Sequence, residues 1–579
     1  MLLRQFFSKH TVSLYVVVLV MFQLLIAFQG FDVCDEGFSL TFYQQFFNAP
    51  TSVEYNFAYW LSGLVGGLWY QLFPEGGILW FRLLAILFNT STLILSYKLL
   101  KPYVNKQVLL VALAMVLFIN DYGFIVFYHN TLTAFLVVLS AYYLIRGLER
   151  QSLYLIGLSA FICAINIFSR LPNTTMLIAL LVVPYYGVLN GDKLKASLKK
   201  IAVYISGAIL GVAFIVLLLY VLGQTQIMRN AIESILNSGS SSASTHSFSN
   251  LFEAYWDNII GIVWQTLKWG SIVVSLIAGW LILPKIKPLK LVWFLVGAVL
   301  FALLFSSKSI YTLYGLTIIG GYIGLTKLFN HPQRHLVLLA ILIAVFLPFG
   351  SDRGIWNSGY MSIWLGLPIA MDVLHKSLDK ALASIRFKKE VKFEKLSVAL
   401  LLVTALGYFS MKSYNIAQQA YFDPGSRLDK TFTIHSKFAK GIYTTEERAK
   451  VINELLPQLQ EHVQPNDALL AYQSLPMLHF LTETKPYLRN PWVWIYDGEI
   501  FENQLKEAQK HTDKLPVVVV QKFETLSEFS APIPDYFSEE REDTYSYSAQ
   551  RTKAMNAFLK ANDYKLVWSN AYFNIYKAK

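Results

Sequence analysis

Apolar runs repeat along most of this chain, and they limit its fold more than any other feature. Hydrophobic residues make up 55% of the 579 residues, whereas charged residues make up only 15%. That balance is too apolar for a soluble protein of this length. A helix that crosses a bilayer needs about 17–25 mostly apolar residues. We therefore expect a polytopic α-helical membrane protein.

The runs are numerous enough to predict about thirteen membrane spans. The first is expected to be retained, because the bulky flank Ala27-Phe28-Gln29 does not fit the small residues of a signal cleavage site. The predicted spans cover residues 11–30, 78–98, 107–120, 131–146, 152–169, 174–190, 201–222, 258–283, 291–306, 309–328, 336–350, 358–375 and 396–413.

Basic clusters between the runs predict the orientation, because cytoplasmic loops carry an excess of Lys and Arg. With the N-terminus inside, every second loop is basic, as in 98–106, 193–200 and 386–395. The opposite loops hold few cations. An odd number of spans then places the chain from about residue 412 onward on the outer side.

Residues 31–77 contain the apolar stretch FAYWLSGLVGGLWYQLF, which is short, rich in glycine and flanked by Glu54 and the sequence PEGG. A crossing here would move every later basic cluster to the outside. We therefore expect two interfacial helices on the outer surface. The alternative, a true crossing that a missed span elsewhere compensates, stays open.

The last part of the chain has the charge pattern of a soluble domain. Residues 444–463 begin with a predicted capping box, Thr444 to Glu447, and continue with apolar residues at helical spacing. The stretches ALLAY, PVVVV, YKLVW and YFNIYK are typical of strands. The sequence therefore predicts a transmembrane part, residues 1–413, and an extracytoplasmic α/β domain, residues 414–579.

Two functional classes are disfavoured by composition. The formal net charge is +12, but the basic residues fall in short clusters between apolar runs and form no continuous stripe for nucleic acid. Cys34 and Cys163 lie in a loop and within a span, so they indicate neither a disulfide framework nor a thiolate metal site. Both are expected to be small buried side chains.

Three acids crowd the position directly after the first span, in the sequence FDVCDEGFSL. If residues 32–47 begin a helix, Asp32, Asp35 and Glu36 share one face. Like charges this close raise one another's pKa, and partial burial raises it further. Such a carboxylate is suited to accept a proton from a hydroxyl nucleophile. The alternative is that the acids only decorate a non-cytoplasmic loop.

An acidic pair after the first span, an interfacial stretch, and then the span RLLAILFNTSTLIL resemble the GT-C membrane glycosyltransferases. Within that superfamily the chain looks most similar to the protein O-mannosyltransferases and the aminoarabinose transferases of lipid A. The resemblance covers roughly residues 10–190. It implies a polyprenyl-phosphate sugar donor, with Asp35 as general base and Glu36 as an orienting or metal-binding partner. The additional Asp32 leaves the choice among the three acids open.

A lipid-phosphate donor needs cations where negative charge develops on the leaving phosphate. Arg170, Arg353 and Lys308 are candidates, because they lie at the predicted outer ends of spans. Arg82 and Lys268 lie within spans, where an unpaired charge costs about 2.5–3.5 kcal/mol, so such residues usually face an interior cavity. The alternative for Arg170, Arg353 and Lys308 is that each is a snorkelling interfacial residue. The alternative for Lys268 is a structural pair with an acid.

His129 in FYHN is within reach of the outer surface and is a candidate contact for the sugar. A lone histidine there is more often a satisfied interfacial residue. Most aromatic residues are expected to form membrane belts. Outer aromatics such as Tyr59 and Trp60 can stack on sugar rings, but nothing in the sequence selects them.

These observations predict a membrane glycosyltransferase that moves a sugar from a polyprenyl-phosphate carrier to a hydroxyl of a lipid, glycan or protein on the extracytoplasmic face. We expect the protein in the bacterial inner membrane, where it contacts membrane lipids and binds no nucleic acid. Whether a divalent metal binds near the acids stays open. The main rival is a polytopic transporter or lipid flippase. A surface-polysaccharide polymerase or ligase and a noncatalytic sensor or scaffold are further rivals.

Overall fold

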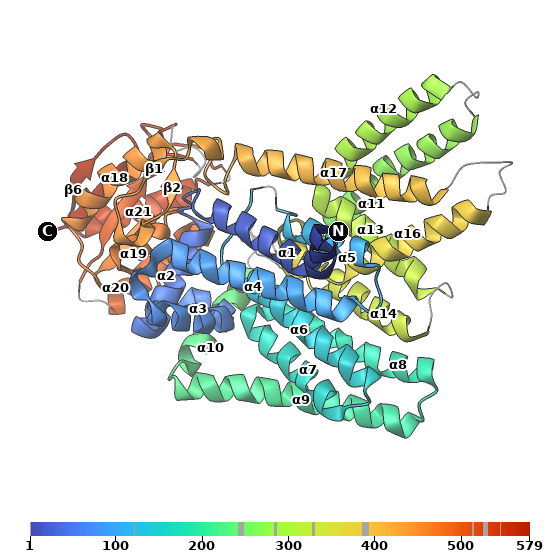
Figure 1. Cartoon of the computed structure of the whole chain (residues 1–579). Coiled ribbons are helices and arrows are strands. Elements are labelled where there is room, and N and C mark those ends of the chain that lie inside the picture. The colour runs from blue at the N-terminus through green and yellow to red at the C-terminus, as the bar shows by residue number, and fades with distance from the viewer. Residues whose placement is uncertain are drawn as a thin grey trace.

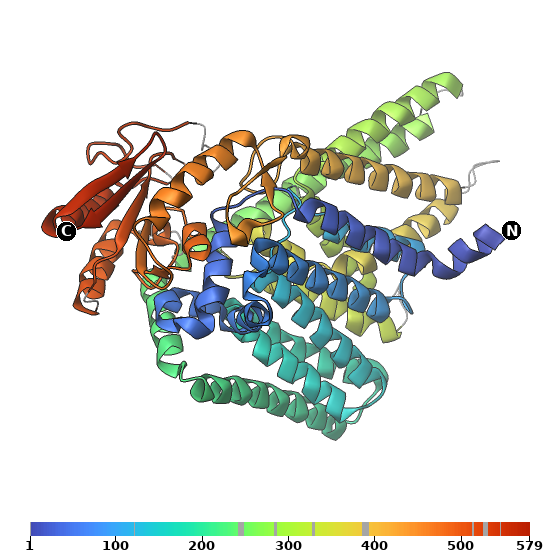
Figure 2. The ribbon, with the colours of Figure 1, turned by 60° about the vertical axis from the view of Figure 1, so that its left-hand side comes forward.

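The computed structural model describes residues 2–579 except residues 121, 241–247, 283–286, 327–330, 352, 385–392, 512–513, 525–530 and 545. Figure 1 shows a bundle of long helices with a sheet-containing domain at one end, which we call the domain end of the bundle. In the view of Figure 2, the N-terminus lies at the opposite end from that domain. The chain therefore starts far from the domain in which it finishes.

Most apolar runs form helices, as the sequence predicts, and several of the helices are broken by short 3-10 segments. In the bundle the elements are α1 (Leu2–Ala27), α2 (Asp35–Asn48), η1 (Pro50–Tyr59), α3 (Trp60–Leu72), η2 (Pro74–Gly76), α4 (Gly77–Leu100), α5 (Lys106–Leu117), α6 (His129–Glu149), α7 (Leu153–Ile165), η3 (Asn166–Ser169), η4 (Leu171–Leu181), α8 (Val182–Asn190), α9 (Leu194–Val221), α10 (Thr225–Ser240), α11 (Phe248–Ile282), α12 (Lys287–Ser306), α13 (Ser309–Leu325), α14 (His331–Phe346), α15 (Ile355–Ser358), η5 (Gly359–Met361), α16 (Gly366–Ser384) and α17 (Phe393–Gln418).

Five helices of the described chain are long and apolar enough to cross a membrane: Pro74–Leu100, His129–Glu149, Leu171–Asn190, Leu194–Val221 and Ser249–Leu276. A sixth results if α12 and α13, bent by 99° at Ser306–Ser309, form one span. Four shorter apolar helices accompany them. The protein is thus mostly helical with several candidate spans, and the number thirteen stays a prediction.

The glycine-rich stretch after the first acids forms short helices at the domain end, and neither α2 nor α3 is among the helices long enough to cross. Glycine is required in α3 because α2 packs directly on it. A Cβ at Gly66 would lie 2.3 Å from the ring of Tyr43. The first helix after them that can cross is α4, at the position predicted for the second span.

The candidate spans 152–169 and 174–190 are separated by a break in the helix. Arg170 is extended at the break, with φ −165° and ψ 119°, and Pro172 follows it. Pro172 lies in the first turn of η4, where proline is tolerated, and it lacks the amide hydrogen that a helix continuing from η3 would need. Both flanking segments, η3 and η4, are 3-10 helices. The break presents Arg170 in the bundle interior, where its side chain is 4% exposed.

The C-terminal part is a mixed α/β domain, as predicted. Its five-stranded sheet has the order β4-β3-β5-β7-β6, in which β3 runs parallel to β4 and β5, and β7 runs antiparallel to β5 and β6. The elements are η6 (Arg427–Asp429), β1 (Phe432–Thr433), η7 (Lys437–Ala439), β2 (Tyr443–Thr444), α18 (Glu446–Gln460), β3 (Ala468–Tyr472), α19 (Met477–Thr482), β4 (Lys485–Pro486), η8 (Val493–Ile495), α20 (Gly498–His511), β5 (Val517–Gln521), α21 (Ala549–Ala561), β6 (Tyr564–Ser569) and β7 (Phe573–Ala578).

Two local predictions for this region need correction. The residue that caps α18 is Thr445, without a side-chain cap bond, so the predicted capping box at Thr444 is wrong. The Thr444 hydroxyl instead donates to Asp423 Oδ2 at 2.7 Å. The predicted border at residue 413 falls inside α17, which continues to Gln418.

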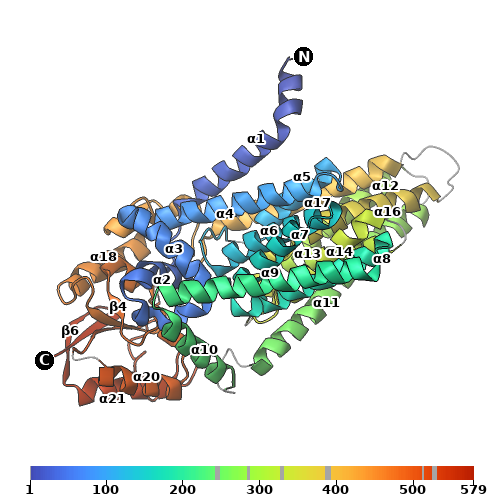
Figure 3. The ribbon, with the colours of Figure 1, turned by 90° about the horizontal axis from the view of Figure 1, so that it is seen from below.

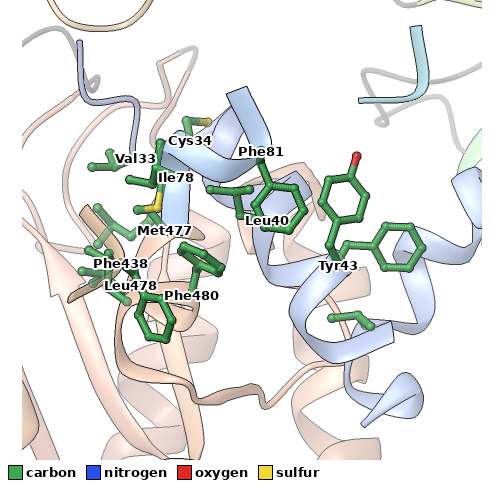
Figure 4. Packing of buried hydrophobic residues seen from close by; sticks show 14 of the residues in the cluster. Val33, Cys34, Leu40, Tyr43, Ile78, Phe81, Phe438, Met477, Leu478 and Phe480 are labelled. Carbon is green, nitrogen blue, oxygen red and sulfur yellow. The ribbon is translucent and has the colours of Figure 1, made fainter. Parts of the chain in front are cut away.

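The C-terminal domain packs on α2 through an apolar cluster. Figure 4 shows Met477, Leu478 and Phe480 of α19 gathered with Val33 and Ile78. Seen from below (Figure 3), the domain lies against one end of the bundle only, while α1, α4 and α9 extend away from it. The acids that open α2 therefore lie where the bundle and the domain meet.

Candidate functional site

Asp32 precedes α2 and binds backbone amides at the start of that helix. Its carboxylate accepts hydrogen bonds from the backbone amides of Cys34, at 2.7 Å, and Glu36, at 2.9 Å. Because α2 begins at Asp35, the prediction that all three acids lie on one helical face is wrong for Asp32. Burial raises the pKa of Asp32 well above its usual value, and the charge of Asp35 adds to that effect. Asp32 therefore holds the backbone at the start of α2 in place through these two hydrogen bonds.

Glu36 forms an ion pair with Arg82 of α4. The guanidinium binds the carboxylate in a bidentate pair, with Nε to Oε1 at 2.8 Å and Nη2 to Oε2 at 2.7 Å. Arg82 also donates to the carbonyls of Ala27 and Gly30. Both side chains of the ion pair are almost completely buried. Arg82 was predicted to bind a donor phosphate, but this pairing gives it a structural partner.

Asp35 is the most accessible of the three acids, since its side chain is half-buried while Asp32 and Glu36 are buried. The Tyr421 hydroxyl donates to Asp35 Oδ2 at 2.5 Å. Burial, followed by the charge of Asp35, raises the pKa of Tyr421 well above its usual value, so this hydroxyl keeps its proton and acts as a donor. The Tyr421 ring also packs on Phe124, with 4.2 Å between centroids.

Tyr421 belongs to a segment that buried charges fasten to the first loop of the chain. Asp423, with 0% exposure, accepts from the Phe31 amide at 2.8 Å and from Lys430 Nζ at 3.0 Å. Arg448 Nε lies 3.6 Å from the same carboxylate, and Arg448 Nη1 donates to the Phe31 carbonyl. This cluster of Asp423, Lys430 and Arg448, which we call the latch, fixes the position of Tyr421 relative to Asp35.

Arg427 joins the same junction from the C-terminal side. Its guanidinium donates to the carbonyls of Ile26 and Gln29 at the end of α1, to Tyr122 at 2.6 Å, and to Ile416. Burial lowers the pKa of Arg427 to about 10, and the positive charge of Arg82 acts in the same direction. Nothing in the sequence had singled out Arg427.

A small pocket with a cavity volume of about 20 Å³ lies at this junction. Charged side chains contributed by the first loop, α4 and the C-terminal segment line it, and aromatic and aliphatic residues of the loop before α6 complete it. The lining includes Asp32, Glu36, Arg82, Tyr421 and Arg427. It is a cavity beside the acids, with both signs of charge on its walls.

Tyr128 directly precedes α6, and its hydroxyl accepts a hydrogen bond of 2.9 Å from the Tyr360 hydroxyl. Burial raises the pKa of Tyr128 to about 12; the charge of Asp35 acts in the same direction and that of Arg170 in the opposite one.

Arg170 binds the loop that carries Arg353. Its Nη1 donates to the Leu347 carbonyl at 3.1 Å and its Nη2 to the Phe349 carbonyl at 3.3 Å. Arg353 lies on the same loop with an exposed side chain, and its carbonyl accepts from Asn258. The break at Arg170 and the loop of Arg353 are therefore neighbours, as a shared phosphate site requires.

The two predicted lysines are placed differently. Lys308 is exposed at the bend between α12 and α13, where its backbone has φ 45°. Lys268 is exposed on α11, so the prediction that it faces an interior cavity is wrong. Its long side chain can reach the membrane surface instead, because lysines carry their charge on a flexible stem.

His129 begins α6 next to Tyr128 and stacks on Tyr59, with 4.0 Å between centroids and 14° between planes. Trp60, in contrast, is fully buried and donates to Gln224 Oε1. Of the aromatics named from the sequence, Tyr59 is thus half-exposed near the site, whereas Trp60 is part of the core. Both cysteines are free and buried, as predicted.

Among the described residues, no group of three or more His, Cys, Asp and Glu side chains has the arrangement to hold a metal ion. Two acids at the junction are already occupied by Arg82 and by backbone amides. The candidate site therefore consists of one accessible carboxylate, its tyrosine partner, and a buried arginine at a helix break.

No family model matches the chain, and no curated protein matches it. One solved structure to which it is similar is the crystal structure of the oligosaccharyltransferase of Archaeoglobus fulgidus in complex with Zn and sulfate. The match has a TM-score of 0.45 and 12% identity, and it covers 88% of this chain and 68% of that one.

Proposed function

We propose that this protein is a GT-C type membrane glycosyltransferase that transfers a sugar from a polyprenyl-phosphate donor to a hydroxyl acceptor on the extracytoplasmic face. The observation that carries the proposal is the half-buried carboxylate of Asp35, the most accessible of the three acids, which accepts a hydrogen bond from Tyr421. In the proposal Asp35 and Arg170 act on opposite ends of one reacting molecule, as base and as phosphate-binding cation.

Asp35 is the general base in this proposal. Asp32 is held by two amides and Glu36 by Arg82, so Asp35 keeps the most accessible carboxylate. Its Oδ2 accepts a hydrogen bond from Tyr421 at 2.5 Å, and its Oδ1 lies 3.9 Å from the Cys34 sulfur. In the proposal this carboxylate takes the acceptor proton. Contact with a positioned base typically contributes about 10²–10⁴ in rate.

The reaction is a single displacement. The acceptor oxygen gives its proton to Asp35 and forms a bond to the anomeric carbon, while the bond from that carbon to the phosphate oxygen breaks. The electron pair leaves with the phosphate, whose negative charge Arg170 stabilises, together with Arg353 of the adjacent loop. Attack opposite the leaving group inverts the anomeric centre.

Placement of the site at the domain end favours this reaction over transport. A transporter binds its cargo near the membrane midplane between two related halves. Here the acids gather at the junction with the C-terminal domain, and Lys268 in the middle of α11 is exposed. In the proposal this junction, and the domain with it, faces the periplasm.

The direct experiment incubates the purified full chain in detergent with a panel of radiolabelled polyprenyl-phosphate sugars and lipid, glycan and peptide acceptors. We expect one donor to be consumed by the wild type and not by Asp35→Asn. Reporter tags at both termini test the orientation. A transfer rate for Asp35→Asn equal to that of the wild type would remove the proposed base.

A further inference from the structure

A row of aromatic rings leads from the proposed base into the C-terminal domain. Phe38 follows Asp35 by one turn of α2, and its ring lies 6.4 Å from Tyr59 and 5.7 Å from Trp492. Trp492 in turn stacks on Trp494 at 5.3 Å with 23° between the ring planes. Three separate segments of the chain therefore contribute to one aromatic surface.

The rings of this row are only partly covered. Phe38, Tyr59, Trp492 and Trp494 all have intermediate exposure, whereas Phe42, one further turn along α2, is 2% exposed in the core. Large aromatic side chains usually dominate a buried core or an interface. Their partial exposure beside a proposed active site leaves ring faces available to a ligand.

Polar groups that have no partner lie at the same place. Gln473 is fully buried, and within the described part of the chain neither its side-chain oxygen nor its nitrogen has a hydrogen-bond partner. The Trp492 indole nitrogen likewise has no hydrogen-bond partner among the described residues. The Gln473 carbonyl accepts from the Trp494 amide at 3.3 Å, so these groups are close neighbours. Buried polar groups are nearly always hydrogen-bonded, so each exception needs an explanation.

The backbone of Gln473 is also unusual, with φ +90°, a conformation that costs free energy in a residue other than glycine. Such residues concentrate at binding and active sites. Gln473 directly follows β3, at the carboxyl end of the parallel strands β3 and β5. Open α/β sheets bind ligands outside the carboxyl ends of such strands.

That edge of the sheet faces α2. The Met477 amide donates to the Val33 carbonyl at 3.0 Å, and the Thr41 hydroxyl donates to the Pro476 carbonyl at 3.0 Å. A Cβ at Gly37 would lie 2.3 Å from the Met477 nitrogen, so the approach is too close for any larger residue. A ligand held at Gln473 and Trp492 would therefore lie beside the helix that carries Asp35.

We propose that Phe38, Gln473, Trp492 and Trp494, together the tryptophan site, bind a sugar ring of the acceptor. This inference rests on the proposed function and narrows its acceptor from any hydroxyl compound to a carbohydrate. A pyranose has an apolar C–H face that packs on an indole and a rim of hydroxyls that donate to and accept from amides. The site supplies both: flat rings, and the neutral polar groups of Gln473 and Trp492.

The test is saturation-transfer NMR on the purified full chain in detergent, with maltotriose, chitotriose and mannotriose as probes. We expect at least one of them to bind the wild type, and Trp494→Ala and Trp492→Ala to weaken its affinity about ten-fold. Trp494→Phe keeps a ring and should retain part of the affinity. Trp256→Ala is the matched control, because Trp256 is 62% exposed on α11.

The same experiment separates this inference from the proposed function. Asp35→Asn should bind the trisaccharide as the wild type does and fail only in transfer. Saccharide binding that depends on Trp494 without any use of polyprenyl-phosphate sugars would support the site and reject the transferase. Wild-type affinity in Trp494→Ala and Trp494→Phe, no binding of any trisaccharide, or binding of a serine-rich peptide in place of sugar would overturn the inference.

Discussion

The two sides of the candidate site are held in different ways. On the acid side, two of the carboxylates are held by other side chains. Arg82 pairs with Glu36, and the Tyr421 hydroxyl donates to Asp35. On the cation side, Arg170 is held by backbone carbonyls, Leu347 and Phe349, at a break in a helix. The first arrangement fixes a carboxylate through side-chain groups, whereas the second holds a cation against the backbone of a loop.

This difference fits the demands of the proposed reaction. A general base must lie within hydrogen-bond reach of one proton, so small displacements of it are costly. A leaving phosphate, in contrast, is stabilised by charge-assisted hydrogen bonds from cations. We therefore expect substitutions on the acid side to affect the chemical step and those on the cation side to affect use of the donor.

The largest effect is expected for Asp35→Asn. Loss of a general base lowers the rate by up to about 10⁴-fold, and initial rates of transfer from the labelled donor measure it. Asp429→Asn, at an exposed position of the same junction, is the matched control and should transfer normally. A thermal unfolding midpoint equal to that of the wild type would show that Asp35→Asn is folded.

Breaking the buried ion pair should reduce stability more than any other change at the junction. Arg82→Met leaves Glu36 charged and buried without its partner, at a cost of about 3–5 kcal/mol. The double variant Glu36→Met/Arg82→Met should recover much of this loss, because it removes both charges. Thermal unfolding in detergent measures both. A double variant as unstable as Arg82→Met would contradict this account of the pair.

On the cation side, Arg170→Ala should lower use of the donor about 100-fold, and Arg353→Ala by less, since Arg353 is exposed. Arg170→Lys keeps the charge but loses the fork that holds both carbonyls, so an intermediate rate is expected. Rates measured over a range of donor concentrations check the prediction. Wild-type dependence on donor in both alanine variants would remove these residues from the phosphate site.

Tyr421→Phe tests how the base is tuned. The Tyr421 hydroxyl donates to the charged form of Asp35, and a hydrogen bond of that kind lowers the pKa of a carboxylate. Its removal should move the acidic limb of the pH–rate profile upward, and initial rates measured over a range of pH check this. Tyr414→Phe, at a 61% exposed position, is the control and should leave the profile unchanged.

The smallest effect is expected for Lys268→Ala. The side chain is exposed on α11, so the rate of transfer and its dependence on donor should stay within about two-fold of the wild type, as for a surface substitution. A loss comparable to that of Arg170→Ala would restore Lys268 as a donor ligand.

Local patterns predicted the elements well, because a span or strand is encoded by consecutive residues. The apolar run after residue 77 forms α4, the run PVVVV forms the buried strand β5, and the glycine-rich stretch forms short helices. The break at Arg170 is local too, since Pro172 marks it. Its burial among carbonyls of residues 347–349 is not, because the partner loop lies 177 positions away.

The parts of the site that were missed depend on contacts between distant segments. Arg82 pairs with an acid 46 positions earlier, and Tyr421 bonds an acid 386 positions earlier. Thr444 has the spacing of a cap but binds Asp423 instead. Periodicity in one sequence carries no information on such pairs, so it identified the acids and could not distinguish their roles.

The latch has a consequence for how the protein is made. The Phe31 backbone leaves the ribosome early, yet the carboxylate and guanidinium that hold it, those of Asp423 and Arg448, are synthesised about 400 residues later. The loop that carries Asp35 must therefore wait for the end of translation before it is fastened. A chain that stalls or is truncated before Asp423 would contain the helices of the bundle but lack the carboxylate and guanidinium that fasten this loop.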